Sequence, residues 1–214
     1  GVALALLPVM PAMPAVPPAA GIGLMIFVQQ IFIGVAIGFM MRIVFATVDL
    51  AGALIGMQMG LSFAIFFDPD AGGQTAVLSD FLALLTTLLF LAVNGHLLLI
   101  EVLVRSFEWL PIGTDIVRAQ GWAYVARAGA TVFAAGLLLA LPVMGILLVA
   151  NISLGVLTRA APQLNLFAVG FPITLTAGFI GVLLMLTNFA PVLQSLFDGG
   201  FDDIGRMLEM LAPL

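Results

Sequence analysis

Four long stretches of this chain contain no Asp, Glu, Lys or Arg, and they constrain the fold more than any other feature. They cover residues 1–41, 81–100, 128–158 and 160–197. Each matches or exceeds the roughly 20 apolar residues with which an α-helix crosses a hydrocarbon core of about 30 Å. Only 8% of the 214 residues are charged, against about 25% in soluble domains. The sequence therefore predicts an all-α integral membrane protein of long, kinked helical hairpins in contact with lipid.

The charged and reactive side chains exclude several classes of function. The net charge is -5, and the six basic residues are all Arg, so a nucleic-acid-binding surface is not expected. Cysteine is absent and there is one His, without a zinc-binding HExxH pattern. We therefore expect no catalytic residue, no cofactor and no metal, and the protein is predicted not to be an enzyme.

Residues 1–20 form a Pro-rich segment, with five prolines between Pro8 and Pro18. Such spacing favours a stiff, partly extended connector over a helix. The segment has no basic region of the kind that begins a signal peptide, and it starts without Met, so we expect that an upstream portion is missing.

The first helix is expected to begin near Gly21 and to continue to about Phe67, because no Pro interrupts it. Over that length it would measure on the order of 65 Å, about twice the hydrocarbon thickness. Two separate spans that meet between Arg42 and Asp49 are the alternative, although that region has no turn signal. Five glycines at four-residue intervals would let other helices approach closely: Gly34 and Gly38, then Gly52, Gly56 and Gly60. The first pair could instead reflect the abundance of Gly in membrane helices, an explanation that fits three in register less well.

The second helix is expected from Val77 to Trp109, after an acidic loop at residues 68–80. It contains a buried polar and charged cluster made of Asn94, His96, Glu101, Arg105 and Glu108. The histidine could handle protons, or it could stay neutral and hydrogen-bond beside Asn94 in a helix interface. The three charged residues could line an aqueous path, or they could form an ion-pair cluster near the membrane surface.

A polar connector is expected at residues 114–121, followed by the interfacial side chains Trp122, Tyr124 and Arg127. A third helix then continues through Pro142 to about Leu157. A hairpin turn follows at residues 158–165, with Arg159, Pro162, Gln163 and Asn165. The returning arm, residues 167–193, should lie antiparallel to the third helix and be kinked or split at Pro172. Residues 198–214 are expected to form a short amphipathic helix, with Phe201, Ile204, Met207, Leu208 and Leu211 on one face. Arginines near the second connector suggest that it is cytoplasmic and the acidic loop external.

Four strings that occur in order resemble the FliR family, a subunit of the flagellar type III export gate with relatives of the SctT, SpaR and YscT type in virulence secretion systems. They are GMQMGLSFAIFFDP (56–69), FLAVNGHLLLIEVLVRSFEWLPIG (90–113), RAGATVFAAGLLLALPV (127–143) and RAAPQLNLFAVGFPITLTAG (159–178). The likeness extends over nearly the whole chain as a single domain. The family carries a further hydrophobic segment at the front, which this chain lacks.

The resemblance implies a role in protein export. FliR-like chains assemble with FliP-like and FliQ-like subunits into a spiral of helical hairpins around a pore. Unfolded flagellar proteins pass through that pore, and the complex engages an FlhB-like switch protein. The implied location is the bacterial inner membrane, within the flagellar basal body. The family assigns this subunit no catalytic residue and no cofactor.

In that setting, the break after the first helix suggests a constriction or plug of the closed pore. Irregular backbone at membrane depth is tolerated only where protein buries it or where it lines a cavity. The residues of this hypothesis are Met57, Met59, Phe63, Phe66, Phe67, Asp68, Pro69, Gly72 and Gly73. The two methionines could instead be ordinary packing, and the loop could be exposed without any gating role.

A small-solute channel or secondary transporter is the alternative function. Its support comes from Pro142 and Pro172, because broken helices resemble the discontinuous spans of transporters. However, the chain shows no convincing inverted repeat, and few charges within its apolar stretches could coordinate a substrate.

Overall fold

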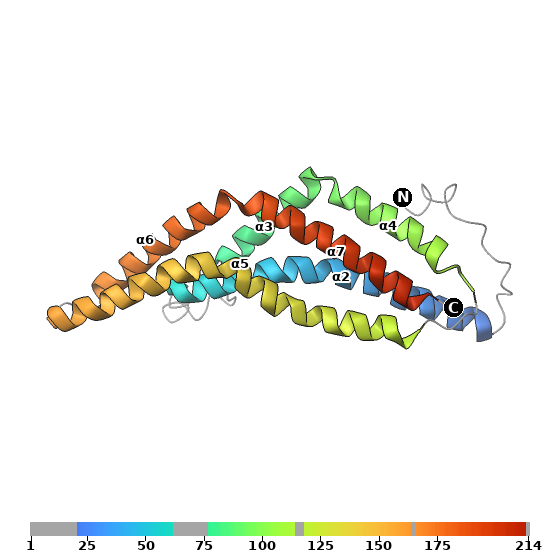
Figure 1. Cartoon of the computed structure of the whole chain (residues 1–214), viewed down its shortest axis with the longest axis horizontal. Helices are drawn as coiled ribbons and strands as arrows, with labels where there is room; N and C mark the ends of the chain where they lie inside the picture. Colours follow the sequence, from blue (N-terminus) through green and yellow to red (C-terminus); the bar gives the residue numbers. More distant parts are fainter. Residues whose placement is uncertain (1–20, 62–76, 114–117, 164–165, 213–214) are drawn as a thin grey trace, which may run out of the picture. The chain divides into compact units, whose positions relative to one another are not determined.

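The structure is a computed structural model that describes residues 21–61, 77–113, 118–163 and 166–212 (Figure 1). The elements in the described residues are all helices: α2 (Gly21–Met59), α3 (Val77–Ala92), α4 (Gly95–Trp109), α5 (Ala119–Ala160), α6 (Leu166–Leu186) and α7 (Phe189–Leu211). The prediction of an all-α chain is therefore confirmed. Three helices, α2, α5 and α6, are long and apolar enough to cross a membrane, and the bent pair α3 and α4 would add a fourth span.

The described residues divide into two compact units. One comprises the described parts of 1–44, 90–130 and 195–214, and the other comprises those of 45–89 and 131–194. We call them the first and the second unit and describe each by itself.

The long α2 helix is continuous through Arg42 and Asp49, so the prediction of one rod is confirmed and the alternative of two spans is wrong. It ends at Met59, however, and not near Phe67 as predicted. Gly60 follows with a φ of 83°, and its N–H donates a hydrogen bond to the Met57 carbonyl over 3.1 Å. Glycine adopts this left-handed conformation without steric cost, and it commonly ends helices in this way.

The predicted single helix from Val77 to Trp109 is in fact two helices, α3 and α4, which meet at a bend of 67°. Asn94 has a φ of 58°, and its N–H donates to the Leu91 carbonyl over 3.1 Å. A Cβ on Gly95 would collide with the Phe90 ring. The Asn-Gly pair therefore makes the break: Asn tolerates the left-handed backbone, and Gly leaves space for the aromatic ring.

Helices α5 and α6 form the predicted antiparallel hairpin within the second unit. A Cβ on Gly181 of α6 would lie 3.0 Å from Val143 Cγ1 of α5, so the two helices approach closely there. Helix α5 begins at Ala119, earlier than predicted, and continues through Pro142. The prediction that Pro172 could split the second arm is wrong, because α6 continues past it to Leu186.

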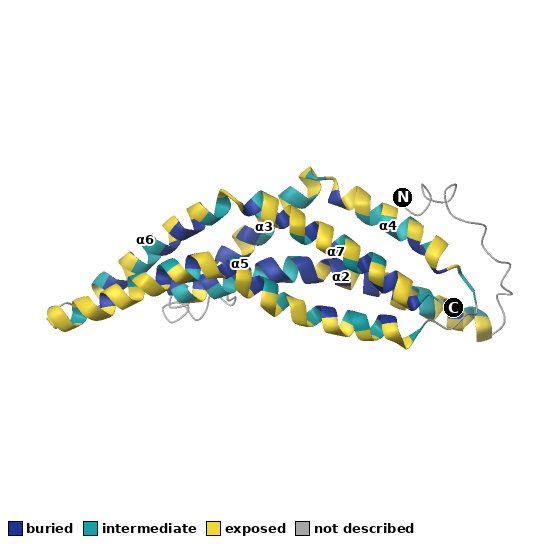
Figure 2. Ribbon diagram, viewed as in Figure 1, coloured by how far each residue is buried: buried dark blue, intermediate teal, exposed yellow. Residues whose placement is uncertain are grey.

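Helix α7 begins at Phe189, so the predicted arm at residues 167–193 is divided between α6 and α7. The predicted amphipathic helix at residues 198–214 is therefore only the latter part of a longer one. Figure 2 shows buried residues recurring along one face of α7. At intervals of three or four they are Phe189, Leu193, Phe197, Gly200, Ile204, Met207 or Leu208, and Leu211. The opposite face exposes the acidic residues Asp198, Asp202 and Glu209.

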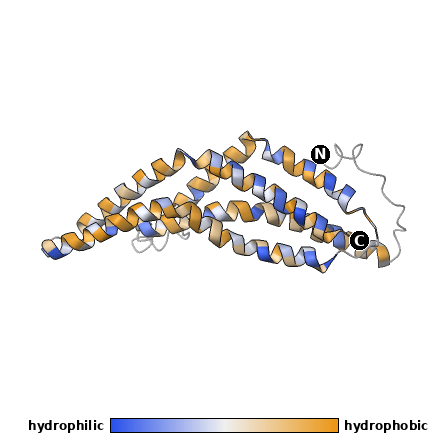
Figure 3. Cartoon of the chain, viewed as in Figure 1, coloured by the Kyte–Doolittle hydropathy of each residue, from blue (hydrophilic) through white to orange (hydrophobic). Residues whose placement is uncertain are grey.

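Helices α5 and α6 differ from α7 because their exposed residues are largely apolar (Figure 3). Within the apolar window of each helix, only 22% of the residues are buried inside the chain. Exposed side chains such as Phe133, Leu138 and Leu183 are more than 60% accessible. Such surfaces are typical of proteins that contact lipid or other apolar subunits.

Candidate functional site

The last residue of α2 is held against α6 within the second unit. The Met59 side chain is fully buried. It lies over Gly178, where a Cβ would approach the Met59 Sδ to 2.7 Å and its Cε to 2.8 Å. One helical turn earlier on α6, the Thr174 hydroxyl donates to the Met59 carbonyl over 3.4 Å and to the Phe171 carbonyl of its own helix over 3.0 Å.

The beginning of α3 is held against α2 in the same unit. The Ser79 hydroxyl donates to the Asp49 backbone carbonyl over 2.6 Å. Gly52 lies directly beneath this contact, since a Cβ there would be 2.5 Å from Ser79 Cα. A side chain at this position would force the two helices apart, so glycine allows the crossing.

Gly56 brings together the two ends of the segment 62–76, which itself lies outside the described residues. A Cβ on Gly56 would be 3.8 Å from Leu61 Cδ1 and 3.8 Å from Leu78 Cβ. Leu61 precedes the segment and Leu78 follows it closely. Leu61 and Leu78 therefore lie at one place beside Gly56, where α6 contacts the end of α2 and α2 contacts the start of α3.

The predicted constriction residues have different positions. Met57 is 65% exposed, whereas the fully buried Met59 packs the interior of the second unit. Between them, the side-chain oxygen Oε1 of Gln58 is buried, and no described residue forms a hydrogen bond with it. The remaining predicted residues lie outside the described part of the chain: Phe63, Phe66, Phe67, Asp68, Pro69, Gly72 and Gly73.

The five predicted packing glycines differ in their surroundings. Gly52 permits the close crossing with α3, and Gly56 makes ordinary contacts. Gly60 ends the helix with a positive φ and is buried, and its role in helix packing stays a prediction. Gly34 and Gly38 are exposed, and a Cβ on either would meet no atom of the described residues within 4 Å. Close packing of these two against a helix of another chain stays a prediction.

The polar and charged cluster on α4 is exposed, so the prediction of a buried cluster within this chain is wrong. Arg105 and Glu101 form an ion pair over 2.7 Å, with side chains that are 57% and 50% exposed. Among the described residues, Glu108 does not form an ion pair with Arg105. Asn94 and His96, at and just after the break, are also exposed. Arg159, Pro162 and Gln163 lie at the exposed α5–α6 turn as predicted, and Asn165 lies outside the described residues.

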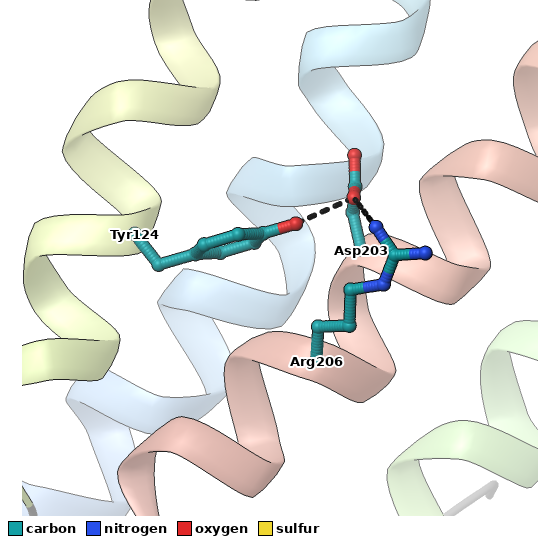
Figure 4. Close-up of polar contacts among 3 residues, drawn as sticks. All are labelled: Tyr124, Asp203 and Arg206. Atoms are coloured by element: carbon teal, nitrogen blue, oxygen red, sulfur yellow. Dashed lines mark hydrogen bonds and ion pairs between the residues drawn. The ribbon is translucent and has the colours of Figure 1, made fainter.

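One polar contact that the sequence did not reveal joins α5 to α7 in the first unit (Figure 4). The Tyr124 hydroxyl donates to Asp203 Oδ1 over 2.6 Å, and Arg206 Nη1 lies 3.9 Å from the same oxygen. Nearby, the Arg118 N–H donates to the Leu211 carbonyl over 3.2 Å. Tyr124 stands out in the sequence as the only tyrosine of the chain, but its distant partner Asp203 could not be identified without the fold.

Taken together, these sites hold and position helices. In the described part of the chain, no group of three or more His, Cys, Asp or Glu residues could bind a metal ion. The closest contacts in the second unit converge on the end of α2 and the start of α3. We therefore take the α2 end, defined as residues 57–61, with its contacts on α6 and α3, as the candidate functional site.

Comparison with known proteins identifies the family. The family described as bacterial export proteins, family 1, matches residues 1–200. The chain is 45% identical to the flagellar biosynthetic protein FliR of Pectobacterium carotovorum subsp. carotovorum over 190 residues, which cover 89% of this chain and 73% of that protein. It is 44% identical to FliR of Escherichia coli (strain K12) over 184 residues, covering 86% and 70% of the two chains. FliR of Bacillus subtilis (strain 168) is 26% identical over 186 residues, covering 86% and 72%. The chain therefore belongs to the FliR family of bacterial export proteins.

Proposed function

We propose that this chain, a flagellar export-gate subunit of the FliR family, assembles with FliP-like and FliQ-like subunits into a pore for unfolded flagellar proteins. The complex lies in the bacterial inner membrane, within the flagellar basal body, and engages an FlhB-like switch protein. The chain itself carries out no catalysis and binds no cofactor. Its contribution is to build the wall of the pore and to close it.

The exposed apolar faces of α5 and α6 are the observation that carries this proposal. Both sides of the hairpin expose large side chains, such as Phe133 on α5 and Phe179 on α6. Lipid can cover one side of a helical hairpin that forms part of a wall, and neighbouring subunits can cover the others. A hairpin that is exposed on several sides therefore suits a member of a larger ring or spiral better than a chain that acts alone.

The assembly can be tested by native mass spectrometry after co-expression with FliP-like and FliQ-like subunits and extraction in mild detergent. We expect one discrete complex that contains all three kinds of subunit. If the chain is recovered alone or as a homo-oligomer while its neighbours assemble without it, the proposed assembly is wrong. Saturable solute uptake by the chain alone in liposomes would instead favour a transporter. The bent α3–α4 pair resembles the discontinuous membrane helices of transporters.

The segment after α2 is the proposed constriction of the closed pore. Support comes from its anchoring: α2 is held by α6 at Met59, and Leu61 and Leu78 both lie beside Gly56. A segment whose two ends are fixed at one place can block a narrow passage without being drawn into it. Asp68, Pro69, Gly72 and Gly73 favour a tight, non-helical backbone within that segment.

Deletion of Ala71 to Gly73 tests the constriction. We expect the assembled complex to leak ions across a liposome membrane, because the shortened segment no longer fills the passage. The matched control is Gln163→Ala at the exposed α5–α6 turn, which changes another connection and should leave the complex tight. Native mass spectrometry of each variant verifies assembly, and a fully assembled deletion variant that is as tight as the parent would refute the constriction.

A further inference from the structure

We propose that Asn151, on the exposed face of α5, is the polar anchor of a docking site for an apolar helix of a neighbouring subunit. That helix presents a hydrogen-bonding group, an amide or a hydroxyl, opposite Asn151. The inference rests on the proposed function and goes beyond it, because it assigns one surface of this chain and the chemistry of the partner that covers it. We call the exposed residues Leu148, Asn151, Ile152 and Gly155 the α5 docking face.

Asn151 lies inside a helix, in contrast to the other asparagines that the structure describes. Asn94 and Asn188 lie at the breaks before α4 and α7, where each forms part of a hydrogen-bonded turn. Asparagine is favoured at such positions because its side chain and backbone suit turns. At position 151 α5 is continuous, and asparagine is among the poorer helix formers. The local structure of α5 therefore does not account for this residue.

The surroundings of Asn151 are apolar. Residues 128–158 contain no charged side chain, and Asn151 lies on the order of 12 Å along the helix axis from Arg159 in the last turn. The side chains beside it on the docking face are large and accessible: Leu148 is 55% and Ile152 is 60% exposed. An amide that enters lipid or an apolar interface without a partner loses the hydrogen bonds that water would provide, and that loss is costly.

The Asn151 side chain forms no hydrogen bond with any described residue. The hydroxyl groups nearby on α5 are satisfied by their own helix: Ser153 donates to the Val149 carbonyl over 2.8 Å, and Thr158 donates to the Gly155 carbonyl over 2.9 Å. Such hydroxyls can face an apolar environment without help from another chain. The amide of Asn151 needs a partner that supplies both a donor and an acceptor, because its NH₂ and its oxygen carry opposite partial charges.

Gly155 leaves space for the partner one helical turn from Asn151. It is exposed, and a Cβ there would meet no atom of the described residues within 4 Å. A polar side chain beside a small residue is typical of helix contacts in membranes, whereas a water-filled path would not favour the large apolar side chains around the amide. An isologous contact between two copies would close a pair, but the wall of a spiral consists of heterologous contacts. The occupant is therefore a helix of a different subunit.

The test measures how much of the chain stays in the complex with FliP-like and FliQ-like subunits, by native mass spectrometry in increasingly harsh detergents. Asn151→Leu should lower the ratio of bound to free chain roughly 3–30-fold, the range expected for one interhelical hydrogen bond in a membrane. Asn151→Gln should recover part of this loss, because it keeps the amide. Ser153→Ala is the matched control and should leave the ratio unchanged, since the Ser153 hydroxyl bonds to its own helix.

Two further variants examine the docking face without changing Asn151. Gly155→Leu should not lower the stability of the isolated chain, because its side chain has open space within the described residues. It should lower the bound ratio, since the partner helix can no longer approach. A photoreactive side chain in place of Ile152 should give an adduct with the mass of this chain plus one FliP-like or FliQ-like subunit.

The outcomes separate this inference from the proposed function. If the parent chain does not assemble with the other two kinds of subunit, the proposed function is wrong and the docking face with it. If the parent assembles but Asn151→Leu stays bound equally well, or the adducts contain only lipid or a second copy of this chain, the docking face is wrong and the proposed function stands.

Two controls complete the test. If Asn151→Cys in the assembled complex reacts with a polar maleimide as fast as in the denatured chain, Asn151 meets water and the docking face is wrong. If Asn151→Leu does not fold, Gly155→Leu and the photoreactive variant decide: an unchanged bound ratio or the lack of a subunit adduct overturns the inference.

Discussion

The crossing of α2 and α3 at Gly52 offers a sharp test of how closely these helices must pack. A Cβ at position 52 would lie 2.5 Å from Ser79 Cα, whereas ordinary contact begins at 3.4 Å. In the Gly52→Ala variant, the helices must therefore separate by about 1 Å, because the obstacle is backbone and cannot rotate away. The hydrogen bond from Ser79 to the Asp49 carbonyl, now 2.6 Å, would lengthen beyond a useful distance.

The expected cost follows from these changes. Overpacking costs about 1–3 kcal/mol, and a lost interhelical hydrogen bond in a membrane protein adds roughly 0.6 kcal/mol. The higher helix propensity of alanine offsets up to about 1 kcal/mol of this cost. We expect Gly52→Ala to lower the free energy of unfolding by about 1–3 kcal/mol, measured by denaturant titration in mixed micelles.

Gly34→Ala is the matched control, since Gly34 lies inside the same helix and a Cβ there meets no atom within 4 Å. It should leave the stability of the isolated chain unchanged or raise it by up to about 1 kcal/mol. Equal stability of the two alanine variants would refute the reasoning, because it would mean that the helices can separate at Gly52 without loss.

Three further substitutions test other contacts. Asn94→Leu should lower the free energy of unfolding by about 1 kcal/mol while Asn94→Gly does not, because leucine is strained at a φ of 58°; denaturant titration compares them, and equal stability would contradict the strain. Tyr124→Phe should cost about 1 kcal/mol in the same assay, and Arg206→Gln less than about 0.5 kcal/mol, since its ion pair is long and exposed; the reverse order would be inconsistent with this geometry. His96→Gln should leave the rate of export unchanged, because His96 is exposed on α4 and takes part in none of the contacts described above; a lowered rate would contradict that.

The fold could be predicted from sequence where a single local property decided it. Charge-free length predicted the helices α2 and α5, and the turn after Arg159 predicted the α5–α6 hairpin. The breaks were misjudged because proline was given too much weight. Pro142 and Pro172 lie inside helices, whereas the real break in the second predicted helix is at Asn94 and Gly95, an Asn-Gly pair that is itself a known turn signal.

The candidate site was less accessible to sequence reasoning. The importance of the stretch around Met59 could be recognised from its glycines and from the break that follows. Its partner Gly178 could not, because the contact depends on how α6 is rotated and how far it has slid along α2. An apolar helix such as α6 carries no stripe that would fix its rotation. Which face of such a helix is buried is decided by close packing between distant residues, and sequence alone does not supply that information.

The contrast between α6 and α7 leads to a final prediction about which surfaces meet water in the assembled complex. The outer face of α7 carries Asp198, Asp202 and Glu209, and burying these carboxylates in lipid would be costly. The outer face of α6 carries Phe179 and Leu183, which lipid or apolar subunits can cover. Since the chain lacks cysteine, single replacements can report the environment of each face.

A cysteine reacts with polar maleimides through its thiolate, which forms readily only in contact with water. In the assembled complex, Asp202→Cys should therefore be labelled much faster than Leu183→Cys, by a factor of about ten or more, because apolar surroundings suppress ionisation of the thiol. Labelling of both sites in the denatured chain provides the control for intrinsic reactivity. If Asp202→Cys is protected as strongly as Leu183→Cys, the acidic face of α7 is covered by another subunit. Its carboxylates would then need cationic or hydrogen-bonding partners from that subunit, because buried charges persist in proteins only when they are paired.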